Sequence, residues 1–244
     1  MDICLVTNKG KVRKSNEDTA VVLGNEFPVA VIVADGMGGH RSGKYASTMA
    51  VNLISEEILR TNIYRINESD IHRMIEKTNQ KIYQESLSDA ELFQMGTTLT
   101  MAIIRQNEFV CGHIGDSRLY LNRNNRVQRI TTDHTFVQNL VDRGIISMEE
   151  ARNNPYRNII TRAVGTENIQ ADVFQHDFRE GDALLFCSDG LTEHISDLEI
   201  QSCLSTGYSA RKISGMLLES ALDRGGSDNI TVVVVCYYGG LDRD

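Results

Sequence analysis

Aspartates at the ends of apolar runs are the residues of this 244-residue sequence best suited to do chemistry. Asp35 ends the run VAVIVA and is followed by Gly36, and Asp189 follows the apolar run in LLFCSDG. Asp116 follows FVCGHIG, and Asp228 precedes ITVVVV in a glycine-rich turn. One such aspartate is usually a turn residue. Four of them at the edges of core strands indicate a site, because sites are commonly built from several loops on a rigid scaffold.

Clustered carboxylates predict a bound cation, because like charges repel one another strongly unless a cation neutralises them. All-oxygen ligation favours the hard ions Mg²⁺ or Mn²⁺. Two such ions that share a carboxylate can hold and activate a water for attack on phosphorus. In this hypothesis Asp35 is the shared ligand and the Gly36 carbonyl is a further one. Glu17 and Asp18, which precede an early strand, add to the acidic set.

Two kinds of basic side chain fit a phosphate reaction. Arg13 lies four residues before Glu17, and a planar guanidinium suits phosphate oxygens. His40 follows the first of the aspartates by five residues and is a candidate general acid for a leaving alkoxide. Taken singly, such an arginine is usually solvated and such a histidine is usually an exposed polar residue. His113 and His134 are similar candidates by chemistry alone.

Composition narrows the class of protein. The net charge of −8 argues against binding of nucleic acid or anionic membrane, which both need a basic surface. The apolar stretches are far shorter than the about 20 residues of a membrane span, and the start does not read as a signal peptide. The five cysteines form no CxxC pair, so a zinc or disulfide framework is not expected. A reduced, cytoplasmic protein fits best, with Cys111, Cys187 and Cys236 in the core.

The elements that must position these residues form an irregular order of strands and helices. Helical periodicity covers 42–60, 69–87 and 209–224, and SMEE and SDLE carry the capping-box spacing of a helix start. No linker is visible, so 1–244 is expected to be a single domain. The order predicts an α+β architecture with mostly antiparallel strands and outer helices, not βαβ alternation. Strands are predicted at 18–23, 29–34, 97–105, 108–114, 118–122, 126–130, 169–177, 182–187 and 230–238.

Eight motifs in order resemble those of the metal-dependent type 2C Ser/Thr protein phosphatases, the PPM family, in their compact bacterial form. The resemblance covers roughly residues 2–238, and eight ordered motifs are far more specific than any one. It implies a four-layer αββα sandwich of two antiparallel sheets flanked by helices. It also implies hydrolysis of phosphoserine and phosphothreonine by direct attack of a metal-activated water. The motifs are GKVRKSNED, VADGMGGH, MGTTL, GHIGDSRLYL, ITTDH, ITRAVG, CSDGLTEHI and GGSDNITVVVV.

The resemblance implies a metal role for each aspartate that matches a motif. Asp35 would bridge two Mn²⁺ or Mg²⁺ ions, and the Gly36 carbonyl would complete the second site. Asp189 and Asp228 would bind the first ion. Asp116 would serve a third, weaker site.

The other matched positions would act around these ions. Glu17 and Asp18 match acidic positions that support the shell of metal-bound water. Arg13 would clamp the phosphate, and His40 would be the general acid.

Two departures from the family pattern and one variable segment stand out. Lys44 occupies a position where bacterial members usually carry Glu, which is expected to change the surface beside the cleft rather than the chemistry. Glu193, a possible partner of the third site, stands where Asp is commoner. The segment 142–162 matches the mobile flap beside the active site, whose sequence varies between members.

Other phosphatase chemistries fit the sequence less well. A cysteine phosphatase needs Cys-x5-Arg, but six residues separate Cys111 from Arg118 and one of them is an acid. An aspartyl-phosphate enzyme would carry Asp-x-Asp, whereas Asp35 is followed by Gly-Met-Gly. A catalytically inactive relative that binds phosphoproteins, and a relative specialised for one phosphorylated regulator, stay open. The single-domain length favours a general phosphatase, expected to be a monomer, that opposes a Ser/Thr kinase.

Overall fold

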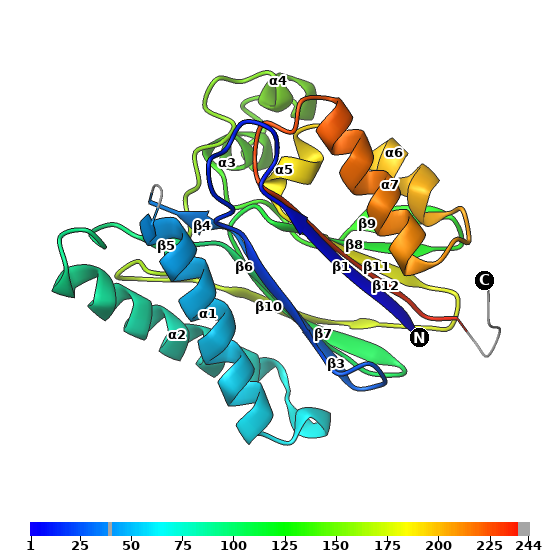
Figure 1. The fold of residues 1–244 in the computed structure, drawn as a ribbon, viewed down its shortest axis with the longest axis horizontal. Helices are drawn as coiled ribbons and strands as arrows, with labels where there is room; N and C mark the ends of the chain where they lie inside the picture. Colours follow the sequence, from blue (N-terminus) through cyan, green and yellow to red (C-terminus); the bar gives the residue numbers. More distant parts are fainter. Residues whose placement is uncertain (39–40, 239–244) are drawn as a thin grey trace.

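The computed structural model describes residues 1–38 and 41–238, and Figure 1 shows the path of the chain. The helices are α1 (Arg41–Arg60), η1 (Ile63–Arg65), α2 (Glu68–Ser88), α3 (Phe136–Asp142), α4 (Met148–Arg152), α5 (Asp189–Thr192), α6 (Asp197–Leu204) and α7 (Ala210–Asp223). The strands are β1 (Asp2–Asn8), β2 (Thr19–Leu23), β3 (Val29–Ala34), β4 (Gly36–Met37), β5 (Gly96–Thr97), β6 (Leu99–Ile104), β7 (Glu108–Ile114), β8 (Arg118–Arg123), β9 (Arg126–Arg129), β10 (Asp172–Asp177), β11 (Ala183–Cys187) and β12 (Ile230–Cys236).

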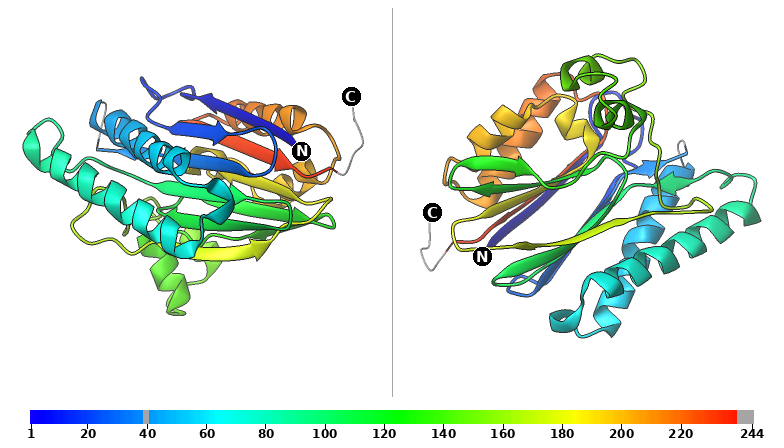
Figure 2. Two further views of the ribbon diagram at one scale, coloured as in Figure 1. Left: turned by 90° about the horizontal axis from the view of Figure 1, so that it is seen from below. Right: turned by 180° about the vertical axis from the view of Figure 1, so that it is seen from behind.

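Two five-stranded antiparallel sheets pack against each other at the centre of the molecule. One has the strand order β1-β12-β11-β8-β9 and the other β10-β7-β6-β3-β2. Helices α6 and α7 cover the outer face of the first sheet, and α1 and α2 cover the outer face of the second (Figures 1 and 2). The predicted four-layer αββα sandwich is therefore confirmed.

Strand β3 shows how the sequence builds these layers. Val29, Val31 and Val33 face the other sheet, while the residues between them face α1 and α2. Successive side chains of a strand point to opposite faces, so a strand buried on both sides must be apolar throughout. Strand β12 divides its valines in the same way between the inter-sheet core and the core under α7.

Most predicted elements are present, with informative exceptions. The hairpin tip at Asn124 and Asn125 is confirmed, since both residues have positive φ. Both capping boxes are formed, at the starts of α4 and α6. Strand β1 was not predicted; it pairs along its whole length with β12 and only partly buries its side chains. None of the helices in the described part of the chain is long and apolar enough to cross a membrane.

One end of the sandwich collects the segments that carry the acidic residues. Strand β3 leads there into β4, β7 turns into β8, β11 leads into α5, and β12 begins there. Helices α3 and α4, which belong to or adjoin the predicted flap, lie over this same end (Figure 1). The fold thus brings four distant loops to one edge.

Candidate active site

The aspartates predicted from the sequence come together at this edge. Asp35 lies between β3 and β4, Asp116 between β7 and β8, and Asp189 opens α5. Asp228 stands in the turn before β12. The carboxyl of Asp35 is repelled by the charges of these three and of Asp18, so all five carboxyls form one cluster.

The backbone of Asp35 is fixed by a pair of threonines in the MGTTL motif. Its N–H donates to Thr98 Oγ1 at 2.9 Å, and its carbonyl accepts from Thr98 N and Thr97 Oγ1, each at 2.8 Å. Thr98 Oγ1 also lies 2.8 Å from Ser117 Oγ, directly after Asp116. This hydroxyl pair therefore couples two of the acidic loops, a role that the sequence analysis did not assign.

Two glycines allow the backbone to pass close to the cluster. A Cβ on Gly36 would stand 2.1 Å from the carbonyl oxygen of Gly43 in the first turn of α1. A Cβ on Gly43 would stand 2.2 Å from Glu17 Oε2. Because real Cβ atoms do not approach so closely, only glycine lets β4, α1 and Glu17 meet here.

Three carboxyl groups of the cluster hold a buried oxygen that has no hydrogen-bond partner, on Asp18, Asp116 and Asp189. The other oxygen of Asp18 accepts from Ser188 Oγ at 2.8 Å and from Thr231 Oγ1 at 2.6 Å. A buried acceptor without a donor is costly, and most such atoms in proteins are paired.

Burial and mutual repulsion make these carboxyls hard to ionise together. Burial is the main cause that raises the pKa of Asp18 to about 6 and that of Asp116 to about 7. The pKa values of Asp35 and Asp189 also lie well above the ordinary range, for the same reason and because of neighbouring carboxylates. A divalent cation would reverse this balance by favouring the charged forms.

The donor set fits Mg²⁺ or Mn²⁺, because it consists of carboxylate and carbonyl oxygens alone. Among residues 1–38 and 41–238, no three His, Cys, Asp or Glu side chains are grouped tightly enough to hold an ion by themselves. Backbone carbonyls and water would therefore complete the ligand shell, which is how Mg²⁺ is commonly bound.

Arg13 reaches the cluster but is engaged there. Its Nη2 lies 2.6 Å from Asp228 Oδ2, and the Arg13 side chain remains about half exposed at 54%. The loop that carries it is held by Asn229, whose amide donates to the carbonyls of Lys9 and Ser15 at 2.9 and 2.8 Å. Asn229 Oδ1 accepts from the N–H of Glu17, so one buried asparagine fixes the whole segment. Asn229 was not among the predicted site residues.

The two departures from the family pattern have structural partners. Lys44 Nζ donates to the Asp18 carbonyl at 2.7 Å and lies 3.0 Å from Thr19 Oγ1, which ties α1 to the start of β2. Glu193, at the end of α5, accepts from Asn158 Nδ2 at 3.2 Å and from Ser227 Oγ at 3.0 Å.

The two other candidate histidines and the candidate cysteine are buried or hydrogen-bonded to protein groups. His113 is buried, its ring nitrogens lie 2.9 Å from Thr100 Oγ1 and 3.1 Å from a backbone carbonyl, and burial lowers its pKa to about 4. His134 Nε2 pairs with Asp172 at 3.1 Å. Burial raises the pKa of the Cys111 thiol, which is the opposite of what a nucleophilic cysteine needs. His40 lies outside the described residues.

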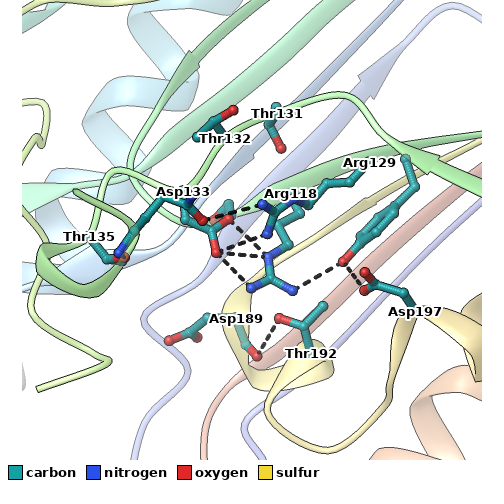
Figure 3. Close-up of polar contacts among 12 residues, drawn as sticks. Arg118, Arg129, Thr131, Thr132, Asp133, Thr135, Asp189, Thr192 and Asp197 are labelled. Atoms are coloured by element: carbon teal, nitrogen blue, oxygen red, sulfur yellow. Dashed lines mark hydrogen bonds and ion pairs between the residues drawn. The ribbon is translucent and has the colours of Figure 1, made fainter. Parts of the chain in front are cut away.

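An ionic network beside the cluster was missed by the sequence analysis. Arg118 donates three hydrogen bonds to the Asp133 carboxylate, the shortest from Nη2 at 2.6 Å, and Arg118 Nη1 donates to the Tyr120 hydroxyl at 3.1 Å. That hydroxyl donates to Asp197 at the start of α6. Figure 3 shows Arg118 beside Asp133, with Asp189 and Asp197 nearby. The network joins β8, the ITTDH motif and α6 next to the acidic site.

Comparison with known proteins shows which protein family has this fold and these motifs. The family model described as protein phosphatase 2C matches residues 11–214. The chain is 40% identical to the serine/threonine phosphatase Stp of Listeria monocytogenes over 236 residues, covering 94% of this chain and 93% of the relative. It is 38% identical to the protein phosphatase PhpP of Streptococcus pneumoniae, covering 96% and 97%.

Solved structures agree with these relatives. The Mycobacterium tuberculosis serine/threonine phosphatase PstP superposes with a TM-score of 0.89 at 34% identity, covering 97% of this chain and 98% of the other. The catalytic domain of PstP in complex with two manganese ions gives a TM-score of 0.85 at 34% identity, covering 95% and 96%. By fold, ordered motifs and identity, this chain belongs to the protein phosphatase 2C (PPM) family of bacterial metal-dependent serine/threonine phosphatases.

Proposed function

We propose that this chain is an active enzyme of its family and that the clustered aspartates are its metal ligands. The observation that carries the proposal is the set of buried carboxyl oxygens without partners on Asp18, Asp116 and Asp189, gathered around Asp35. A catalytically inactive relative that only binds phosphoproteins is the second reading. It is disfavoured because such a protein would be expected to have lost one of the central carboxylates, and none is missing.

Each ligand is assigned from its position in the cluster and from the motif that it matches. Asp35 would be shared by two Mn²⁺ or Mg²⁺ ions, and the Gly36 carbonyl would complete the second site. Asp189 and Asp228 belong to the first site, and Asp116 belongs to a weaker third one. When bound, the two ions activate a water for direct attack on the phosphorus of phosphoserine or phosphothreonine.

The remaining residues act on the substrate and on the ligand shell. Arg13 leaves its pair with Asp228 to donate to phosphate oxygens, because a bidentate guanidinium matches a phosphate group. Glu17 and Asp18 would hold water at the ions through their carboxyl oxygens. His40 protonates the departing serine or threonine alkoxide.

The cellular setting follows from the same activity. The substrates are phosphorylated proteins, and the partner reaction is that of a cognate Ser/Thr protein kinase. The protein is proposed to work as a cytoplasmic monomer, without nucleic acid or membrane. Residues 1–244 are proposed to form one catalytic domain with a flap near 142–162.

Hydrolysis of a phosphothreonine peptide tests the proposal. Wild-type protein with Mn²⁺ should release phosphate, and EDTA or Asp189→Asn should abolish the release because each removes a component of the metal centre. Asp223→Asn, which replaces a carboxyl that is 84% exposed and has a long ion pair of 3.9 Å with Lys11, is the matched control and should keep full activity. Activity that survives both EDTA and Asp189→Asn would refute the two-ion assignment. A wild-type protein that binds the peptide without turnover would favour the inactive relative.

A further inference from the structure

A cavity of about 450 Å³ lies between the flap and the acidic end of the sandwich. On one side it is lined by Asp116, Asp189 and Glu193, next to the proposed metal centre. On the other side it is lined by α4 and the loop that follows it, including Arg152 and Arg157. Helix α4 and α5 lie at the same end of the molecule (Figure 1).

The arginines that line this cavity fall into two groups. Three are paired with acids that line the same cavity: Arg118 and Arg129 with Asp133, and Arg224 with Glu199. The side chains of Arg152 and Arg157 make no hydrogen bond and no ion pair with any residue of the described chain, and both are exposed. The flap wall therefore presents two uncommitted cations to the cavity.

The wall that carries these cations is anchored. Helix α4 starts at a capping box between Ser147 and Glu150, with both reciprocal bonds formed. In the loop that follows, Asn158 Nδ2 donates to Glu193 Oε1 at 3.2 Å and ties the flap to the end of α5. The rings of Phe136 and Tyr156 pack edge to face at 6.2 Å, which joins this loop to α3. These contacts place Arg152 and Arg157 on the flap side of the cavity in this structure.

We propose that Arg152 and Arg157 select phosphoprotein substrates that carry a second negative group a few residues from the phosphate to be removed. The proposal rests on the proposed function, because the first phosphate is placed at the acidic, metal-binding side. An extended peptide advances about 3.3 Å per residue, so a group three residues from the first phosphate lies on the order of 10 Å from it along the chain. A guanidinium binds carboxylate and phosphate oxygens by the same charge-assisted hydrogen bonds, so both anions fit.

Three phosphothreonine peptides that differ only in the flanking residues test this selection. One has neutral flanks, one has glutamates, and one has a non-hydrolysable phosphonate as the second phosphate-like group. Wild-type protein with Mn²⁺ should show a higher kcat/KM for both anionic peptides than for the neutral one. In the double variant Arg152→Ala/Arg157→Ala this preference should fall by about fivefold to tenfold, since exposed charge pairs are individually weak. A preference confined to one anionic peptide identifies that anion as the group recognised.

Controls separate this proposal from the one on which it rests. Arg143→Ala removes an exposed arginine after α3 that does not line the cavity, and it should keep the wild-type preference. Added salt should weaken the preference of the wild type, because exposed charges are screened. Equal kcat/KM for all three peptides in the wild type, or an undiminished preference in the double variant, would overturn the selection while leaving the phosphatase activity intact. Equal losses by the double variant on the peptides and on an aryl phosphate would show a structural role and would also overturn it. Absence of hydrolysis of every substrate by the wild type would instead count against the proposed function.

Discussion

Replacement of Asp18 by asparagine should stabilise the metal-free protein and weaken its response to metal. Asp18 is 1% exposed, one of its oxygens accepts two hydroxyl hydrogen bonds, and the other has no partner. Asparagine keeps an acceptor for the two hydroxyls and places an N–H₂ group near Asp35. The substitution therefore removes a buried charge without removing the hydrogen bonds.

The magnitude follows from the raised pKa. The folded protein holds the Asp18 proton with a pKa of about 6, against an ordinary value of 3.8. At ~1.4 kcal/mol per pKa unit, ionising Asp18 costs the folded state about 3 kcal/mol above pH 6. The cost grows as pH rises from 3.8 to 6, because the folded state then binds more protons than the unfolded chain. It is only about 0.5 kcal/mol near pH 4, where the carboxyl is largely protonated in the folded protein.

Thermal unfolding in EDTA measures this difference. At pH 8 Asp18→Asn should raise the midpoint by about 6–12 °C, at ~2–4 °C per kcal/mol for a chain of this size. At pH 4 the two proteins should unfold within about 2 °C of each other. Added Mn²⁺ should raise the midpoint of the wild type more than that of the variant, because ligand binding stabilises only the folded state that binds it.

Two outcomes would refute the reasoning. One is a variant that is less stable than the wild type at pH 8 in EDTA. The other is an equal gain at pH 4 and pH 8, which would show that the charge is not the cause. Asp223→Asn serves as the matched control, because its side chain is 84% exposed and should give no pH-dependent change.

Two further predictions concern residues around the centre. His40→Ala should reduce turnover of a phosphothreonine peptide more than turnover of an aryl phosphate, since a good leaving group needs little protonation; equal losses on the two substrates would count against the acid role. Arg118→Leu leaves the Asp133 carboxylate buried, with Arg129 at 3.4 Å as its remaining ion-pair partner among the described residues. Arg118→Leu should lower the free energy of unfolding by about 3 kcal/mol in urea titration. The control Arg126→Leu, at an exposed position in the same hairpin, should change it little. A loss for Arg118→Leu no larger than that for Arg126→Leu would contradict the prediction.

The sequence predicted the positions of the acidic residues because their signal is local. A carboxylate beside glycine at the end of an apolar run, as at Asp35 and Asp189, predicts both the strand and the end of it at which the site lies. The glycine at 36 carries a second signal, and its cause is now specific: the carbonyl of Gly43 approaches where a side chain would stand. The family resemblance then ordered these local signals into one site.

The supporting residues could not be predicted in the same way, because their partners are far away in the chain. Asn229 holds carbonyls more than 200 residues earlier, and Thr98 reaches Asp35 across 63 residues. Both residues lie in family motifs, MGTTL and GGSDNITVVVV, but neither motif indicates which distant segment the side chain contacts. Strand β1 escaped prediction for a related reason, since its mixed sequence becomes a strand only when β12 pairs with it.

The position of β12 has a consequence for a chain that is still on the ribosome. In its sheet β12 lies between β1 and β11, and the turn before it supplies Asp228 and Asn229. A nascent chain that has left the ribosome as far as Asp189 already contains Asp18 and Asp35, but it lacks β12. Without β12, β1 has no strand that connects it to β11. Phosphatase activity should therefore appear only once β12 has been synthesised and has paired. A chain truncated before β12 should be inactive rather than partly active.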